Sequence, residues 1–301
     1  MRDFSLILAT VGRTNELNRL FDSLLAQTYH DFEVIIVDQN DDDRLLPVVH
    51  RARCLGIVLR HLKHSPPNLA CARNTGIAAA QGAWLGFPDD DCWYEPQTLE
   101  RIILRSRRID KPQGVISRWT EQDAERPPGI LSWKRSSNFR DIPVSSITLF
   151  FQRELFDRIG GFDGRLGVGQ WFGAGEETDI VLRALQTGAL LVHEPNAEVH
   201  HRVETASAGF SSVARRNARH RARGTGAMYA KHRLSIWVIL RGLISPLLKP
   251  LWRGALGAEL AHGWAITLGR LDGWLHWSYK HRDKEKKSSS KRIEPFLNSS
   301  H

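Results

Sequence analysis

At 301 residues, 42% of them hydrophobic, the chain can hold one large domain or two small ones with a sizeable core, which excludes disordered and fibrous proteins. Its three cysteines form no CxxC pair, which excludes a disulfide framework and a four-cysteine zinc site and favours a reducing, cytoplasmic compartment. The formal net charge is +9, but residues 205–301 carry 18 Lys and Arg against 5 Asp and Glu, leaving 24 against 28 in residues 1–204.

The first hundred residues alternate apolar runs with helical patterns, which is typical of a mostly parallel sheet covered by helices. The apolar run 4–9 predicts a buried strand and is too short for the hydrophobic region of a signal peptide. Further strands are predicted at 32–37, 57–61 and 83–87. The helices predicted between the strands are 17–25 with Asn15 as N-cap, 45–55 and 68–81. This order predicts an α/β fold.

The section from 110 to 174 has a weaker pattern. It predicts a pair of strands, a turn and a glycine-rich loop, at 114–117 with 146–151, at 160–163 and at 167–175. A helix with an inward apolar face is predicted next, at 176–188.

The sequence changes character after about residue 210. A basic run without acids, 215–233, precedes an apolar and Trp-containing stretch, 234–252. Arg241 and Lys249 interrupt this stretch, whereas a membrane-spanning helix needs about 20 mainly apolar residues. The combination therefore predicts attachment at a membrane interface, and an amphipathic helical subdomain that packs on the sheet is the alternative.

Polar clusters follow three of the predicted strands, at 10–13, 38–43 and 89–91. Ligands bind beyond the carboxyl ends of strands in open α/β sheets. The cluster Asp89, Asp90 and Asp91 can offer oxygens to Mg²⁺ or Mn²⁺, which would also take phosphate oxygens from a substrate. A solvated turn is the alternative for an acidic triplet, and its place after a buried strand favours the metal site.

A second acidic cluster, Glu176, Glu177 and Asp179, begins a predicted helix directly after the glycine-rich loop. Acids stabilise the positive end of a helix, so capping alone would account for them. The functional alternative is a general base that accepts the proton of an incoming hydroxyl.

Taken in order, these segments resemble glycosyltransferase family 2 with its GT-A fold, a Rossmann-like sheet flanked by helices. The matching segments are LATVGR, VIIVDQND, ARNTGIAAAQGAWLGFPDDD, IGGFD, GAGEETDIVLRALQTG and EPNAEVHH. The likeness covers about residues 4–202. It implies an inverting transfer from a nucleoside-diphosphate sugar, most often a UDP-sugar, to a hydroxyl of a saccharide or lipid-linked acceptor in glycan or polysaccharide synthesis.

The resemblance also implies roles for single residues. The nucleotide sugar would be bound by Thr10, Arg13, Asp38, Arg73, Asp89 and Asp90, with Asp38 near the base. Asp89 and Asp91 would form the DxD pair that holds Mn²⁺ or Mg²⁺, Asp91 most directly. Glu177 would be the base at a position where the family usually has aspartate, which leaves Glu176 and Asp179 as alternatives.

Three further side chains are candidates on chemical grounds. His200, or its neighbour His201, would add an imidazole ligand to the metal, and a buried structural histidine is the alternative. Trp171 and Phe172 would stack on an acceptor sugar, and simple packing is the alternative.

We therefore expect a catalytic domain at 1–209, a helical membrane-associating segment at 210–279 and a disordered charged tail at 280–301. The basic and Trp-rich segment would bind an anionic membrane, which predicts a peripheral enzyme on the inner face of the cell membrane.

Other functions have weaker support in the sequence. Nucleic-acid binding is not expected, because the predicted sheet edge is acidic and no base-reading motif occurs. A nucleotidyltransferase would normally carry a glycine-rich signature after the first strand, where residues 9–15 hold one glycine. The absence of QxxRW argues against a processive synthase. A non-catalytic sugar-nucleotide-binding or scaffold protein of the same fold stays as the alternative.

Overall fold

The computed structural model describes residues 2–121, 127–137, 139, 142, 144–202, 210–255 and 257–290, with 281–290 described for their backbone only. The chain forms two compact units. The first holds residues 1–134, 138–169 and 176–205, and the second holds 135–137, 170–175 and 206–301. The predicted boundary between 209 and 210 falls at the edge of a segment outside the described residues, so it stays a prediction.

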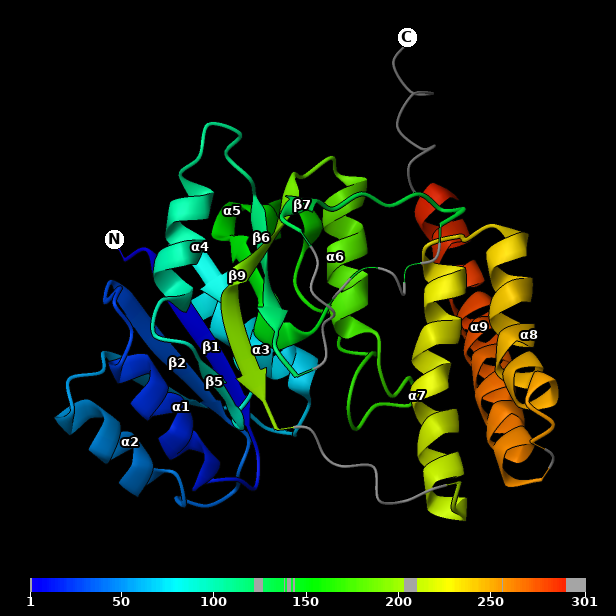
Figure 1. Cartoon of the computed structure of the whole chain (residues 1–301), viewed down its shortest axis with the longest axis horizontal. Coiled ribbons are helices and arrows are strands. Elements are labelled where there is room, and N and C mark those ends of the chain that lie inside the picture. The colour runs from blue at the N-terminus through cyan, green and yellow to red at the C-terminus, as the bar shows by residue number, and fades with distance from the viewer. Residues whose placement is uncertain are drawn as a thin grey trace, which may run out of the picture. The chain divides into compact units, whose positions relative to one another are not determined.

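The described part of the first unit is built on a nine-stranded sheet with the order β3-β2-β1-β4-β8-β6-β9-β5, and β7 pairs with β9 (Figure 1). The strands are β1 (Phe4–Thr10), β2 (Phe32–Asp38), β3 (Leu59–Lys63), β4 (Trp84–Gly86), β5 (Cys92–Tyr94), β6 (Gly114–Trp119), β7 (Gly129–Ile130), β8 (Leu149–Gln152) and β9 (Leu191–His201). The pairs β1–β2, β1–β4, β2–β3 and β6–β9 are parallel, and β5, β7 and β8 run antiparallel to their partners. The sheet is therefore mixed and mostly parallel at the β3–β4 end.

Two hydrophobic clusters cover the two faces of this sheet. Because side chains alternate along a strand, Leu6 and Leu8 of β1 lie in one cluster and Ile7 lies in the other. The helices that contribute to the first cluster are α1 (Glu16–Leu25), α2 (Leu46–Cys54) and α4 (Thr98–Ser106). Those that contribute to the second are α3 (Leu69–Ala79), α5 (Arg153–Ile159) and α6 (Glu176–Gln186). This arrangement confirms the predicted α/β fold class.

The helix α3 lies unusually close to β1. Its N-cap is Asn68, whose side chain accepts a hydrogen bond from the Cys71 backbone N at 3.0 Å. A Cβ added at Gly76 would lie 2.3 Å from Cγ2 of Ile7, so only glycine fits this approach. The same helix carries Arg73 to the edge where β1, β2 and β4 end.

Most differences from the predicted elements concern their ends. The third strand begins at Leu59 instead of residue 57, and α3 ends at Ala79 instead of at 81. Asn15 precedes α1 as predicted, but its side chain makes no capping hydrogen bond. The sequence pattern did not indicate β5 or α4, which follow the acidic triplet.

The second unit contains α7 (Ser212–Lys231), α8 (Ile236–Trp252) and α9 (Ala258–Ser290), with α9 in contact with both of the others (Figure 1). No helix among the described residues is both long enough and apolar enough to cross a membrane. The predicted tail begins at 280, whereas the backbone is helical to Ser290. Residues 291–301 lie outside the described residues.

Candidate active site

The polar clusters that follow β1, β2 and β4 meet at one edge of the sheet. Thr10 and Asp38 are direct neighbours in the parallel register of β1 and β2. The hydroxyl of Thr10 donates a hydrogen bond to Oδ2 of Asp90 at 2.7 Å. The edge therefore joins the first strand to the acidic triplet, as expected for the ligand-binding side of an open sheet.

Asp38 is a fully buried anchor for the neighbouring loops. Its Oδ1 accepts from the backbone N and side-chain Nδ2 of Asn40, and its Oδ2 accepts from His61 Nε2 and Lys63 Nζ, both at 2.9 Å. Burial acts to raise the pKa of Asp38, but these donors outweigh it and hold the pKa below its usual value. Asn40 in turn accepts from the Gly12 N–H at 2.7 Å.

The three carboxylates of the triplet have different partners. Asp89 accepts from Arg73 NH2 at 3.0 Å and from the Ser146 hydroxyl at 3.2 Å. Asp90 and Asp91 share the Arg13 guanidinium, at 2.7 and 2.5 Å. Arginines and a serine hydroxyl from other parts of the chain therefore hold the triplet in place. A solvated turn would have water in place of these partners.

Asp91 also pairs with His201, whose Nε2 lies 2.8 Å from Asp91 Oδ1. The hydrogen bond to Asp91 raises the pKa of His201. Burial acts to raise the pKa of Asp91, but His201 and Arg13 outweigh it and lower that pKa. By contrast, burial raises the pKa of Asp89 and of Asp90. Asp91 is thus the acid of the triplet whose surroundings favour the ionised form.

Arg73 joins the triplet to the acidic start of α6. Its side chain is only 2% exposed. One guanidinium nitrogen, NH2, donates to Asp89, and the other, NH1, donates to Oε1 of Glu177 at 3.3 Å. The two acidic motifs that the sequence singled out therefore lie on either side of one buried cation.

The other two acids of α6 face different surroundings. Asp179 is fully buried and accepts from Nε of Arg183 at 2.9 Å. Glu176 is 3% exposed, and its Oε2 has no hydrogen-bond partner in the described part of the chain. Burial, with the nearby Glu177 charge, raises the pKa of Glu176 to about 8. Gly167 packs so tightly on Glu176 that an added Cβ would lie 2.8 Å from its Cδ.

The structure pairs His201, and not the predicted His200, with the triplet. The ring nitrogens of His200 lie 2.9 Å from Glu95 Oε1 and 2.7 Å from Glu121 Oε1, and its ring stacks on Trp93. The two histidines are adjacent in β9, so their side chains point to opposite faces of the strand. The contacts of His200 with Glu95 and Glu121 do not test its predicted role as a metal ligand. Because His201 is the histidine that pairs with Asp91, it is the better candidate for that role.

The residues around Asp91 are compatible with a divalent ion. Carboxylate oxygen and imidazole nitrogen both suit Mn²⁺. Asp91 Oδ1 and His201 Nε2 are 2.8 Å apart, so both would reach one ion once His201 has lost the proton that it donates to Asp91. Among the described residues, no group of three or more acids, histidines or cysteines is arranged to hold an ion.

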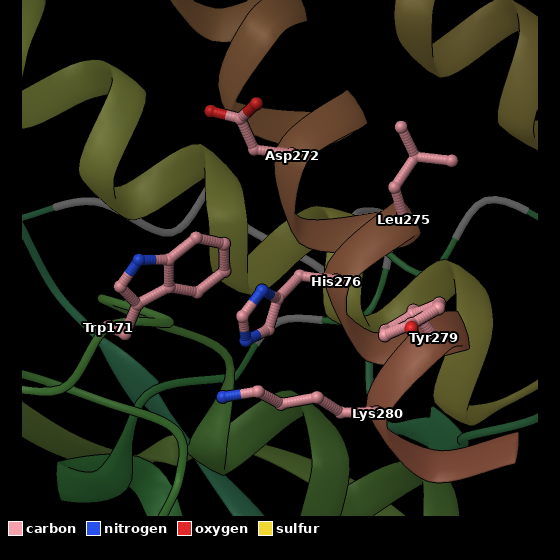
Figure 2. A pocket seen from close by; sticks show the side chains of 6 residues that line it. All are labelled: Trp171, Asp272, Leu275, His276, Tyr279 and Lys280. Carbon is pink, nitrogen blue, oxygen red and sulfur yellow. The ribbon is translucent and has the colours of Figure 1, made fainter. Parts of the chain in front are cut away.

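The predicted acceptor residues Trp171 and Phe172 belong to the second unit. Phe172 is buried against His276 and Trp277 of α9. Trp171 is partly exposed, stacks on His276 with ring centroids 4.2 Å apart, and has the Arg223 guanidinium 4.5 Å from its ring centre. Trp171 lines a pocket of about 740 Å³ together with Asp272, Leu275, His276, Tyr279 and Lys280. Figure 2 shows these side chains.

Residues 5–162, about half of the chain, match the family model described as glycosyl transferase family 2. The chain belongs to glycosyltransferase family 2. This confirms the resemblance inferred from the ordered motifs.

Two relatives illustrate this family 2 membership. An uncharacterised glycosyltransferase of Haemophilus influenzae is 34% identical over 205 residues, which cover 64% of this chain and 65% of the relative. A PGL/p-HBAD biosynthesis glycosyltransferase of Mycobacterium tuberculosis is 35% identical over 171 residues, which cover 55% of this chain and 65% of the relative. The chain thus spans just under two thirds of each of these proteins.

Solved structures of similar fold bind nucleotide sugars. TarS of S. aureus (residues 1–349), in complex with UDP-GlcNAc, gives a TM-score of 0.55 at 15% identity and covers 90% of this chain and 92% of that one. A mannosyltransferase from Pyrobaculum calidifontis, in complex with GDP-Man and Mn²⁺, gives 0.59 at 15% identity and covers 98% and 81%. At this identity the likeness establishes the GT-A fold of the family 2 chain.

Sequence reasoning did not indicate several residues of this site. Lys63 had a usable signal, because it lies just after the predicted strand 57–61 and so at the same carboxyl edge of the sheet as Asp38. The structure pairs it with Asp38 in the β2–β3 register. Ser146 had none, since a serine that begins a short 3₁₀ helix before β8 is common and only the tertiary fold brings it to Asp89.

Proposed function

We propose that this family 2 protein transfers a sugar from a nucleoside-diphosphate sugar, in the first place a UDP-sugar, to an acceptor hydroxyl with inversion at the anomeric carbon. The observation that carries the proposal is the bridge from Asp89 through Arg73 to Glu177. It joins the acids of the DxD motif and the acid proposed as base in one site. The complexes of similar fold with UDP-GlcNAc and GDP-Man support a nucleotide-sugar donor.

Arg13 and Arg73 would stabilise the charge that develops on the leaving diphosphate. A fixed donor directed at a developing charge contributes roughly 3 to 4 kcal/mol in other enzymes. Both guanidiniums are already positioned, Arg13 by Asp90 and Asp91 and Arg73 by Asp89. Since Asp38 has no exposed surface, we propose that it acts by positioning Asn40 and Lys63 for the nucleotide.

Asp91 and His201 would hold Mn²⁺ or Mg²⁺, with His201 in the place predicted for His200. When bound, the ion would offset negative charge on the diphosphate. Asp89 would then serve mainly to orient Arg73, because that carboxylate already accepts from Arg73 and Ser146.

Glu177 is our candidate for the general base. The acceptor oxygen would bond to the anomeric carbon as the bond to the diphosphate oxygen breaks, so the electron pair leaves with the diphosphate and the acceptor proton moves to Glu177. Among the three acids at the start of α6, Glu177 alone forms an ion pair with Arg73, and its side chain is partly exposed. A single displacement of this kind inverts the anomeric centre.

The acceptor would be a saccharide or a lipid-linked saccharide. Trp171 is 41% exposed and would contact an acceptor sugar with the part of its ring that His276 and Arg223 leave open, whereas the buried Phe172 would support Trp171. The chain joins Trp171 to Glu177 through only five residues. We therefore keep Trp171 as the proposed acceptor residue.

A thermal-shift and turnover panel of UDP-, GDP- and dTDP-sugars, with and without Mn²⁺, tests the proposal. We expect one UDP-sugar to stabilise the chain in a metal-dependent way and to be turned over. D91N should lose both effects, and D110N, which removes an exposed carboxylate paired with Arg105, should keep them. Stabilisation without turnover would favour the non-catalytic alternative, and no stabilisation by any sugar nucleotide would refute the donor assignment.

A further inference from the structure

The helix α8 exposes an apolar surface along its whole length. Its large exposed hydrophobic side chains are Ile236, Trp237, Leu240, Ile244, Leu248, Leu251 and Trp252. Trp237 is 77% exposed and Trp252 is 95% exposed. With about 100° of rotation per residue, these seven side chains fall within an arc of about 160° on a helix about 25 Å long. We call this surface the α8 face.

Contacts with α9 fix the orientation of this face. Pro246 has no N–H to bond the Gly242 carbonyl, and the buried Arg270 of α9 donates to that carbonyl instead. Thr267 of α9 donates to the neighbouring Leu243 carbonyl at 2.8 Å. The buried side of α8 thus faces α9, which lies beside it in Figure 1. The residues of the α8 face lie on the opposite side of the helix from its buried residues.

Exposed cations flank the α8 face. Arg241 and Lys249 are exposed on α8, and Arg233 and Arg253 are exposed next to its two ends. The stretch 205–258 contains ten Lys and Arg and no Asp or Glu. The face therefore combines apolar area with a cationic border.

The sequence indicated the basic run of α7 as the source of positive charge for lipid binding. In the structure, other residues of the second unit neutralise part of this charge. Arg219 donates to Asp272 of α9 at 2.8 Å, and Arg223 lies over the Trp171 ring. Arg241 and Lys249 of α8 form no ion pair with an acid in the part of the chain that the structure describes. This difference moves the expected contact with lipid from α7 to α8.

We propose that the α8 face docks on an anionic lipid bilayer. Trp237 and Trp252 would enter the headgroup region with the aliphatic side chains between them, and the exposed cations Arg241, Lys249 and Arg253 would lie at the lipid phosphates. A second copy of the chain is a poorer occupant, because two such cationic borders would repel each other. The proposal concerns the second unit and uses none of the residues proposed for the donor, so it holds whether or not the proposed transfer is correct.

Co-sedimentation with lipid vesicles tests this docking. The full chain should sediment with vesicles that contain about 30% phosphatidylglycerol in phosphatidylcholine, more weakly with pure phosphatidylcholine, and more weakly at high salt. W237E/W252E should reduce binding to the anionic vesicles tenfold or more. L104E/I109E is the matched control, because it places the same charges at two exposed hydrophobic positions of the first unit.

R241Q/K249Q should lower binding to the anionic vesicles without changing the weak binding to phosphatidylcholine. Circular dichroism and the thermal shift with nucleotide sugar verify that each variant is folded. The proposal is overturned if the unmodified chain stays in the supernatant with anionic vesicles, or if W237E/W252E binds them as the control does. A dimer that W237E/W252E dissociates, without any vesicle binding, would assign the α8 face to a second copy instead.

Discussion

Replacing Glu176 with glutamine should change how the stability of the protein depends on pH. Glu176 is buried, its Oε2 has no partner among the described residues, and its pKa is raised from the ordinary 4.5 to about 8. Between these two values the folded chain binds a proton at Glu176 that the unfolded chain has lost. The free energy of unfolding therefore falls as pH rises through this window.

The size of the effect follows from the two pKa values. Glu176 adds about 3 kcal/mol to the free energy of unfolding at pH 5.5, about 1 kcal/mol at pH 7 and almost nothing at pH 8.5, relative to its fully ionised state. Glutamine has nearly the shape of the protonated acid and does not ionise. E176Q should therefore match the unmodified chain near pH 5.5 and be more stable by about 3 kcal/mol at pH 8.5.

Urea denaturation of both chains at pH 5.5, 7 and 8.5 measures this difference. The raised pKa of His201 affects both chains alike, so it cancels in the comparison. A stability difference between E176Q and the unmodified chain that is constant from pH 5.5 to 8.5 would refute the assignment of a neutral Glu176.

Three further changes test the packing, the helix cap and the metal ligands. G76A should lower the free energy of unfolding by about 1 to 3 kcal/mol, because the new Cβ meets Ile7; an unchanged urea midpoint would contradict the close contact of α3 and β1. N68A should cost about 1 kcal/mol through loss of the cap on α3, measured in the same way, and a cost near zero would count against the cap. H201N should abolish the Mn²⁺-dependent part of the donor's thermal shift and H200N should keep it, whereas the reverse order would return the metal role to His200.

The fold could be predicted where sequence pattern and burial agree. The strands β1 and β2 are buried throughout and appear as mainly apolar runs, so their positions followed from hydrophobicity. The strand β9 gives no such signal, because it contains Pro195 and several polar residues. In the structure, Pro195 falls where the β6–β9 register shifts from Ser117–Glu194 to Arg118–Glu198, an irregularity that accommodates proline.

The candidate site was predictable in its residue types and less so in its contacts. The acids of the triplet and of α6 follow from their places at a strand end and a helix start. Which histidine meets Asp91 depends on the pairing of β5 with β9, in which Cys92 lies opposite His201. A shift of one residue would exchange the faces of His200 and His201, and a single sequence does not fix that register.

Single-turnover kinetics of E177Q with the preferred sugar nucleotide is the most direct test of the central claim that the triplet and α6 form one catalytic site. We expect E177Q to slow the transfer about 10² to 10⁴-fold, the usual contribution of a general base, while donor affinity stays close to that of the unmodified chain. E176Q should lose less than E177Q. Transfer at an undiminished rate by E177Q would contradict the account.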